Sequence, residues 1–357
     1  MSKMLKSILI AAFALLFIAC GESENSANSN SNSTQNSANL GQNSQNSTQN
    51  SANLGQNSKV IRAFGVNPRL TVMLEILNPQ GVIGLNYKPY PEDLEFMPEG
   101  AESLPVLGLH GDVGFENVVS QKPDLVVFLP NTDTAMTEPF EKIGIKTIQV
   151  SANFSDLATS LPALGAALGV SERAKKLLKF YQKQEARLNE LRAKVQKKPT
   201  IYFAYGLEGL TTECVKEGAS NDLATMIGAQ NVVQCSLFAA SGRFNNMNFE
   251  QIISLDPDVV FVREIGLYKE LLEKPSAQWA RVSAVKNKRI FYAPSSPSNW
   301  LTRPPSIMRI IGYPWAFAKL HPELLSENEA KKIAQEFFAE FLRPLSDEAY
   351  RRLEAKD

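Results

Sequence analysis

Apolar segments recur along most of the chain and follow two periodicities. Short apolar runs bounded by polar or turn residues predict strands, whereas apolar residues every three or four positions predict helices. In the first half, strands are predicted at residues 60–65, 81–86, 124–129 and 147–150, and helices at 68–77, 115–120 and around 140–143. Strands that alternate with helices indicate a mostly parallel α/β sheet.

One long amphipathic helix is predicted from Ser171, its expected N-cap, to Gln196. A second α/β pattern follows, with strands at 200–206, 258–262 and 289–293 and helices at 221–227, 306–320 and 327–341. The predicted fold is therefore α/β, with two Rossmann-like lobes of mostly parallel sheets joined by one long α-helix. The expected boundaries are 59–170 for the N-terminal lobe, 171–197 for the linking helix and 198–357 for the C-terminal lobe.

The two halves share a sequence motif. Residues 115–128 (FENVVSQKPDLVVF) align without a gap with residues 249–262 (FEQIISLDPDVVFV). In each copy Phe-Glu opens a helix, Pro-Asp ends it and an apolar strand follows. The repeat predicts two similar lobes with a cleft between them.

The N-terminus has the pattern of an export signal. Basic residues precede an apolar run from Ile8 to Ala19, which is too short to span a bilayer as a helix. The run ends at Cys20 after a small residue, so residues 1–20 are predicted to be a lipoprotein signal peptide with Cys20 as the lipidation site. An ordinary signal peptide that happens to contain Cys20 is the alternative.

Residues 21–58 consist almost entirely of Asn, Ser, Gln, Ala, Gly and Thr, and residues 33–44 repeat at 47–58. Such a segment has too little apolar surface to offset the entropy of folding. We expect a disordered tether with a root-mean-square span of roughly 35 Å.

Composition narrows the possible functions. The 357 residues are 44% hydrophobic, and 37 basic residues balance 37 acidic ones, which gives no general attraction to nucleic acid. The chain lacks the common phosphate-binding, dinucleotide-binding, zinc-protease and serine-hydrolase motifs, so we do not expect an enzyme. With only two His residues, a catalytic zinc site is not expected either.

Several patterns, taken in order, resemble the class III periplasmic binding proteins of ABC importers, the group that binds vitamin B12 and ferric siderophores. They are the duplicated Glu…Pro-Asp motif, the single linking helix, the stretch from Trp279 to Phe291, and Asn299–Arg303. The resemblance covers residues 59–345. It implies a lipid-anchored binding protein that captures a metal chelate (iron–siderophore, haem or cobalamin-like) and delivers it to a permease dimer with its ATPase.

The resemblance and the residue chemistry together suggest a ligand site. His110 occupies the position of a ligand-facing aromatic residue in the B12-binding relative, and imidazole could also ligate a metal. Arg303 offers a planar fork for carboxylates or oxyanions, although a surface ion pair would also explain it. The other candidate ligand contacts are Tyr87, Tyr205, Arg243, Arg263 and Trp300. For the aromatic residues, core packing is the alternative.

The resemblance also assigns Glu116 and Glu250 as contacts for the permease, one in each lobe. Cys214 and Cys235 remain as an even pair after lipidation of Cys20, so we expect a disulfide, with two free thiols as the alternative. We expect a monomer at the periplasm or the outer face of the cytoplasmic membrane, with no intrinsic cofactor. A nickel or cobalt chelate, a molybdate-like oxyanion, and a surface adhesion role without transport stay open.

Overall fold

The computed structural model describes residues 59–108, 114–216, 223–240, 242 and 244–355. The described residues belong to one compact unit that begins at Ser58. The predicted signal peptide, its lipidation site Cys20 and the predicted tether lie outside the described residues. Within the described part, no helix is both long and apolar enough to cross a membrane.

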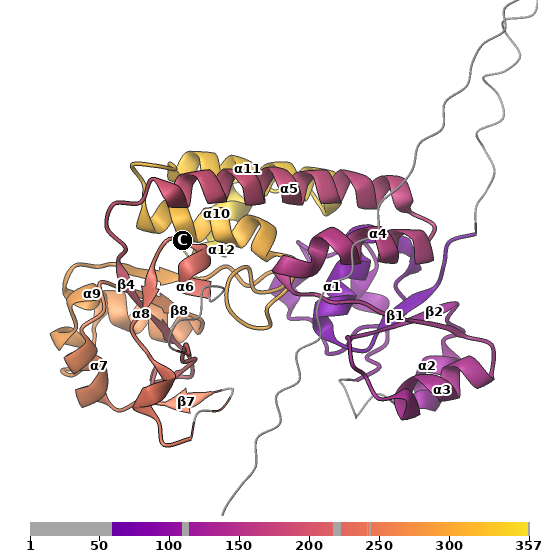
Figure 1. Ribbon diagram of the computed structural model, residues 1–357, viewed down its shortest axis with the longest axis horizontal. Coiled ribbons are helices and arrows are strands. Elements are labelled where there is room, and N and C mark those ends of the chain that lie inside the picture. The colour runs from indigo at the N-terminus through magenta and orange to yellow at the C-terminus, as the bar shows by residue number, and fades with distance from the viewer. Residues whose placement is uncertain (1–58, 109–113, 217–222, 241, 243, 356–357) are drawn as a thin grey trace, which may run out of the picture. The chain divides into compact units, whose positions relative to one another are not determined.

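The N-terminal half contains a parallel three-stranded sheet (Figure 1). Its strand order is β1 (Ala63–Gly65), β2 (Leu125–Phe128) and β3 (Lys146–Gln149). The helices of this half are α1 (Pro68–Leu77), α2 (Phe115–Ser120), α3 (Thr134–Lys142) and α4 (Leu157–Ala167). The strand expected at 81–86 is reduced to single parallel bridges from Val82 to Ala63 and from Leu85 to Val106.

Helix α5 (Ser171–Ala193) leads to a second parallel sheet. The strand order is β6 (Gln230–Asn231), β4 (Thr200–Ala204), β8 (Val259–Val262) and β9 (Ile290–Tyr292), beside an antiparallel pair of β5 (Thr211–Thr212) and β7 (Asn245–Asn246). The remaining helices are α6 (Leu223–Met226), α7 (Phe249–Leu255), α8 (Ile265–Glu273), α9 (Ser283–Lys286), α10 (Arg309–Leu320), α11 (Glu327–Phe341) and α12 (Asp347–Leu353). The predicted α/β class with mostly parallel sheets is confirmed.

The start of α5 differs from the prediction. Its N-cap is Val170, which makes no side-chain cap, and Ser171 is already the first helical residue. The preceding residue Gly169, at a φ of 70°, ends the connection from α4 and brings the chain directly into the new helix. The side-chain cap expected from Ser171 is therefore wrong, although the helix itself is confirmed.

The duplicated motif has a structural basis in both halves. The Asp124 carboxylate accepts a hydrogen bond from the backbone N–H of Arg62, 2.9 Å away, just before β1. The Asp258 carboxylate accepts one from the backbone N–H of Thr200, also at 2.9 Å, at the start of β4. Each Asp thus ties its own strand to the beginning of the neighbouring strand. The residues before the two prolines also adopt the same left-handed backbone, at φ values of 53° and 39°.

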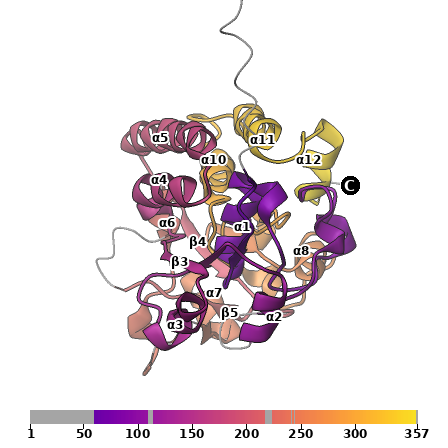
Figure 2. The same ribbon diagram turned by 90° about the vertical axis from the view of Figure 1, so that its right-hand side faces the viewer.

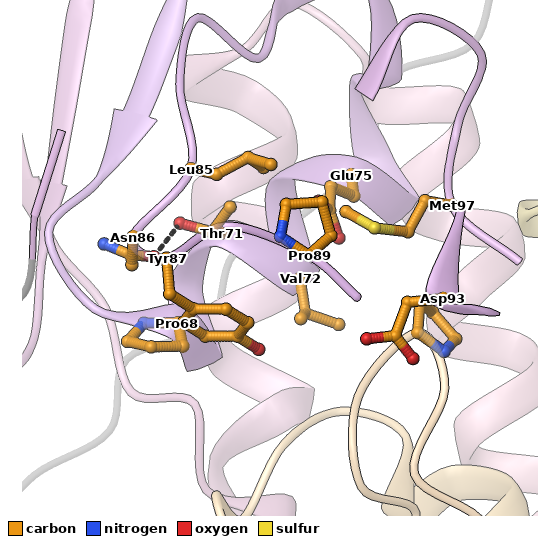
Figure 3. Close-up of a pocket in the computed structure, with 11 residues that line it drawn as sticks. Pro68, Thr71, Val72, Glu75, Leu85, Asn86, Tyr87, Pro89, Asp93 and Met97 are labelled. Carbon is orange, nitrogen blue, oxygen red and sulfur yellow. Dashed lines mark hydrogen bonds between the residues drawn. The ribbon is translucent and has the colours of Figure 1, made fainter. Parts of the chain in front are cut away.

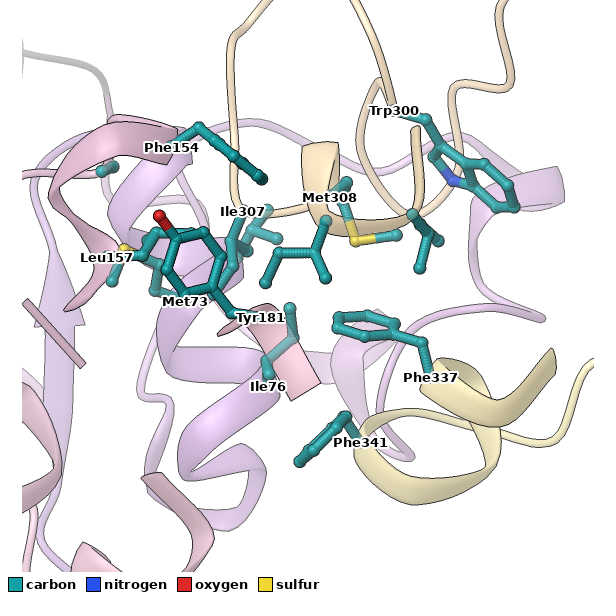
Figure 4. Close-up of a cluster of buried hydrophobic side chains, with 14 of the residues drawn as sticks. Met73, Ile76, Phe154, Leu157, Tyr181, Trp300, Ile307, Met308, Phe337 and Phe341 are labelled. Carbon is teal, nitrogen blue, oxygen red and sulfur yellow. The ribbon is translucent and has the colours of Figure 1, made fainter. Parts of the chain in front are cut away.

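Helices α5, α10 and α11 lie side by side (Figures 1 and 2). The large hydrophobic core beneath them combines residues that precede α5 with residues that follow it (Figure 4). Phe154 packs on Tyr313 with ring centroids 4.7 Å apart and on Tyr181 at 5.0 Å. Gly312 of α10 lies against the Trp300 backbone so closely that any side chain there would collide with it. The segment around Trp300 is therefore held in a defined position.

Candidate functional site

The carboxyl ends of β4 and β8 present a group of exposed apolar side chains. The two strands pair in register, with Ala204 opposite Val262, so the loops that follow them leave the same edge of the sheet. Leu207 on the first loop is 82% exposed, and Ile265 after β8 is also exposed. Ligands of α/β proteins bind outside the carboxyl ends of parallel strands, which makes this edge the candidate site.

Arg303 brings positive charge to this region. Its guanidinium donates from Nε to the Glu213 carboxylate, and it lies over the exposed ring of Phe244 at 5.1 Å from the centroid. The Arg303 side chain is only 20% exposed and that of Glu213 only 30%, so water screens this ion pair less than a surface pair. The arrangement combines a cation, a carboxylate and an aromatic face.

Arg303 and Glu213 line a cavity of about 220 Å³. Arg309 also lines it, and its guanidinium donates to the backbone carbonyls of Leu301 (2.9 Å) and Thr302 (3.2 Å). The other lining residues are Phe203, Cys214, Val215, Leu223, Asn231, Thr302 and Pro305. Among these side chains, two arginines against one glutamate give the cavity a net positive charge, which favours an anionic group.

Tyr205 is a buried residue that packs against the candidate site. It is 3% exposed, and its ring packs edge-on against Phe244 with centroids 6.2 Å apart. Burial raises the pKa of the Tyr205 phenol well above its usual range, and the nearby Glu213 carboxylate raises it further. The hydroxyl therefore stays protonated at any physiological pH. Tyr205 offers almost no surface to a ligand and acts by positioning Phe244.

The other predicted ligand contacts do not all lie at this candidate site. Arg263 is exposed at the carboxyl end of β8, and its side chain has no hydrogen-bond or ion-pair partner among the described residues. Tyr87 lies elsewhere, on a separate small cavity in the N-terminal half. His110 and Arg243 lie outside the described residues. The structure therefore brings together Arg303, Tyr205 and, at the same sheet edge, Arg263.

Trp300 is not available to a ligand in this structure. It is completely buried, its indole N–H donates to the Ser296 carbonyl at 2.9 Å, and its ring packs against Phe338 and Tyr350. The prediction that it contacts the ligand is corrected to a core role, because its ring is enclosed by side chains of α11 and α12. Within the described residues no cluster of three or more His, Cys, Asp or Glu could hold a metal ion.

A disulfide joins Cys214 and Cys235, whose Cα atoms are 4.9 Å apart. A parallel bridge between Val215 and Gln234 lies directly beside it. The disulfide therefore fixes the segment that carries Glu213, the partner of Arg303. Its place on the cavity wall could not be read from the sequence.

Glu116 and Glu250 occupy equivalent positions in the two halves. Glu116 lies in the first turn of α2 and Glu250 in the first turn of α7. Both are exposed, and neither has an ion-pair partner among the described residues. A carboxylate in the first turn is favoured by the helix dipole, typically by 0.3–1 kcal/mol. Both carboxylates are free to meet a partner.

The periplasmic binding protein family matches residues 81–297, which is more than half of the chain. The chain therefore belongs to the periplasmic binding protein family, which confirms the resemblance seen in the sequence at the family level. A solved ABC transporter solute-binding protein from Sulfurospirillum deleyianum is similar over 82% of this chain and 94% of its own, with a TM-score of 0.71 and 28% identity.

Two curated relatives match more distantly. The ABC transporter substrate-binding lipoprotein YvrC of Bacillus subtilis is 23% identical over 187 residues, which are 50% of this chain and 57% of YvrC. The haem uptake protein IsdE of Staphylococcus aureus is 20% identical over 208 residues, which are 56% of this chain and 70% of IsdE. The chain thus spans little more than half the length of the first of these relatives.

Sequence reasoning missed several residues of the site. Glu213 and Phe244 contact Arg303 but lie far from it in the sequence, so no spacing pattern connects them. Leu207 and Ile265 offered a usable signal, since each is a large apolar residue one to three positions after a predicted strand. Exposed apolar residues that gather at one edge of a sheet are the pattern of a ligand surface, whereas one such residue alone is not.

Proposed function

We propose that this chain is the ligand-capturing component of an ABC importer for an amphiphilic, anionic metal chelate, with haem as the first candidate. The observation that carries the proposal is the pairing of exposed apolar side chains (Leu207, Phe244) with a cavity lined by Arg303 and Arg309. Haem has a flat apolar ring and two carboxylates, which match these two halves of the site. The name of the relative IsdE, a haem uptake protein, supports the choice.

Titration of the purified chain with haemin, followed by the change in haem absorbance, tests the proposal. The Arg303→Gln variant should bind about tenfold more weakly, because one charge-assisted hydrogen bond is worth about 1.5–3 kcal/mol. Arg281→Gln, which removes an equally positive but exposed side chain elsewhere, is the matched control. Failure of the wild-type chain to bind haemin in a saturable way would reject haem as the ligand.

The same titration distinguishes the alternatives. A ferric siderophore, a cobalamin, a nickel or cobalt chelate and molybdate are tested in turn by calorimetry. Tight binding of molybdate alone would favour the oxyanion alternative, which needs the arginines but not the exposed apolar residues. Binding of none of these ligands would favour an adhesion role over transport.

We further propose that Cys20 carries the lipid anchor and that the chain works as a monomer at the outer face of the cytoplasmic membrane or in the periplasm. The export-signal pattern that ends at Cys20 supports the anchor. Glu116 and Glu250 are proposed as the docking contacts for a permease dimer. Their equivalent, exposed positions in two similar halves suit a partner with two-fold symmetry.

A further inference from the structure

A second cavity lies in the N-terminal half, beside α1, and shares no lining residue with the Arg303 cavity (Figure 3). Its volume is about 20 Å³, enough for one group the size of a water molecule. Most of its wall is apolar and consists of Pro68, Val72, Leu85, Pro89, Met97 and Pro297. The other lining residues are Thr71, Glu75, Asn86, Tyr87 and Asp93, and these carry the polar groups of the wall.

Glu75 is the unusual member of this wall. It lies on α1, where the neighbouring residues from Leu70 to Leu77 are all buried, and it is itself 3% exposed. Its carboxyl has no hydrogen bond or ion pair with any other described residue, although it lines the cavity. Burial of an unpaired carboxyl is costly, by several kcal/mol if it is ionised. A group in the cavity that satisfied Glu75 would remove this cost.

Four further side chains with oxygen atoms line the same space: Thr71, Asn86, Tyr87 and Asp93. Thr71 and Asn86 are hydrogen-bonded to each other and to backbone carbonyls, which leaves Tyr87 and Asp93 as the groups of interest. In Figure 3 the Tyr87 hydroxyl and the Asp93 carboxylate point toward each other across the pocket. Asp93 is held in place by the Ser296 hydroxyl, which donates to it from the C-terminal half. Besides Thr71 and Asn86, the cavity offers two carboxyl groups and the Tyr87 hydroxyl to whatever occupies it, with no cationic side chain on its wall.

We propose that this cavity binds the head group of a small primary alkylammonium ion. An ammonium group has three N–H donors and no acceptor, and Glu75, Asp93 and Tyr87 provide three acceptors. The small cavity admits only the ammonium group itself, and the attached alkyl chain would extend out of it. A divalent metal fits less well, because Ca²⁺ requires six to eight oxygen ligands and Mg²⁺ a nearly ideal octahedron.

Binding of a cation here must change the protonation of Glu75. Burial raises the pKa of the Glu75 carboxyl to about 8, so at pH 7 the empty site holds a mostly protonated acid. The nearby groups Asp93 and Tyr87 also have raised pKa values, again through burial first. An ammonium ion stabilises the carboxylate form of Glu75, so binding at pH 7 should release nearly one proton. Above pH 8 the release should decline.

Calorimetry on the purified full chain tests this proposal with propylammonium as the probe. Titrations at pH 7 in two buffers of different ionisation enthalpy, neither of them a primary amine, give the number of protons released. The proposal requires saturable binding, release of 0.5–1 proton, and at least tenfold weaker binding of tetramethylammonium, which has no N–H donor. Equal binding of neutral 1-propanol, or release of no proton, would overturn it.

Variants assign the effect to the cavity. Glu75→Gln keeps the shape of the side chain but removes its charge, and should weaken propylammonium binding at least tenfold and abolish proton release. Glu102→Gln, an exposed carboxylate outside the cavity, is the matched control and should change neither. If Glu75→Gln does not fold, Tyr87→Phe replaces it, with an expected threefold or greater loss. Unchanged binding in the folded cavity variant would reject the site.

Discussion

Arg303 is bonded through its guanidinium to the Glu213 carboxylate, 90 residues away in the sequence, while its flat face lies over Phe244. Both residues of this ion pair line the 220 Å³ cavity. Glu213 therefore occupies the place that a ligand carboxylate would take on Arg303. An anionic ligand has to compete with this internal carboxylate before it can bind the guanidinium.

The first prediction concerns this competition. Glu213→Gln removes the competing charge but keeps a hydrogen-bonding side chain, so affinity for haemin should rise by about three- to tenfold, or about 0.7–1.4 kcal/mol. The double variant Glu213→Gln, Arg303→Gln should lose this gain, because the guanidinium that benefits is absent. Titration of the single and double variants measures both effects. A lower affinity of the single variant would show that Glu213 itself contacts the ligand.

The second prediction concerns the stability of the fold against pH. The Glu75 pKa is about 8 in the folded chain, against 4.5 without burial. The unfolded chain therefore loses this proton first, and the folded state becomes less stable as the pH rises from about 4.5 to about 8. Asp93, whose pKa is also raised, contributes in the same direction.

Glu75→Gln should remove most of this dependence and stabilise the chain by about 3 kcal/mol at pH 7, since each pKa unit is worth 1.36 kcal/mol. Urea unfolding at pH 5 and pH 8, in buffers without primary amines, measures the difference. The two proteins should be nearly equal at pH 5 and diverge at pH 8. Parallel stability curves for the two proteins would contradict the assignment.

The third prediction concerns the disulfide between Cys214 and Cys235. It closes a loop with a sequence separation of 21, for which the chain-entropy relation gives a stabilisation of about 3 kcal/mol. The variant with both residues changed to Ala should unfold at lower urea concentration by this amount. It should also bind haemin more weakly, because Glu213 and the cavity wall lose their support. A thiol assay on denatured wild-type chain should detect no thiol from this pair.

The sequence was a good guide to the fold because the core elements carry their signal locally. The helices at 68–77, 115–120 and 327–341 agree with the structure at both ends, since each has a clear start and a polar or Pro-containing stop. Helix α4 was missed because Pro162 lies inside it and its residues are apolar on most sides, which hides the helical period. Helix α8 was missed for a different reason, because it starts immediately after a strand.

The candidate site was predicted less completely. Arg303 could be chosen for its chemistry, but Glu213 and Phe244 reach it only through folding, and no local pattern reveals such contacts. A large aromatic residue such as Trp300 can serve as a ligand contact or as a core residue, and only its burial in the structure distinguishes the two roles. Glu75 had a signal that went unused: a single carboxyl within the apolar run Val72–Leu77 is a buried acid that needs a partner.

The fourth prediction concerns the repeated Pro-Asp motif. Asp258 accepts hydrogen bonds from the backbone N–H and the hydroxyl of Thr200, both at 2.9 Å, and the backbone bond is the main cause of its lowered pKa. Asp258→Ala should therefore destabilise the chain by about 1–3 kcal/mol at pH 7. Because the folded pKa is the lower one, this contribution should disappear as the pH falls through it. Urea unfolding at pH 7 and pH 3 measures the loss, and an equal loss at both would contradict it.

The last prediction concerns the docking of the chain on a permease. Glu116 and Glu250 are exposed, lie in equivalent first turns, and have no ion-pair partner among the described residues, so their removal should not disturb the fold. Exposed ion pairs are individually weak, about 0–1 kcal/mol, so a single change should reduce uptake only slightly. The double change Glu116→Ala, Glu250→Ala should reduce uptake at least tenfold in vesicles that contain the cognate permease and ATPase, while ligand affinity and unfolding stay unchanged. Glu102→Ala, Glu273→Ala, which removes two exposed carboxylates elsewhere, should transport normally. Full transport by the Glu116, Glu250 double variant would show that the permease binds another surface of this chain.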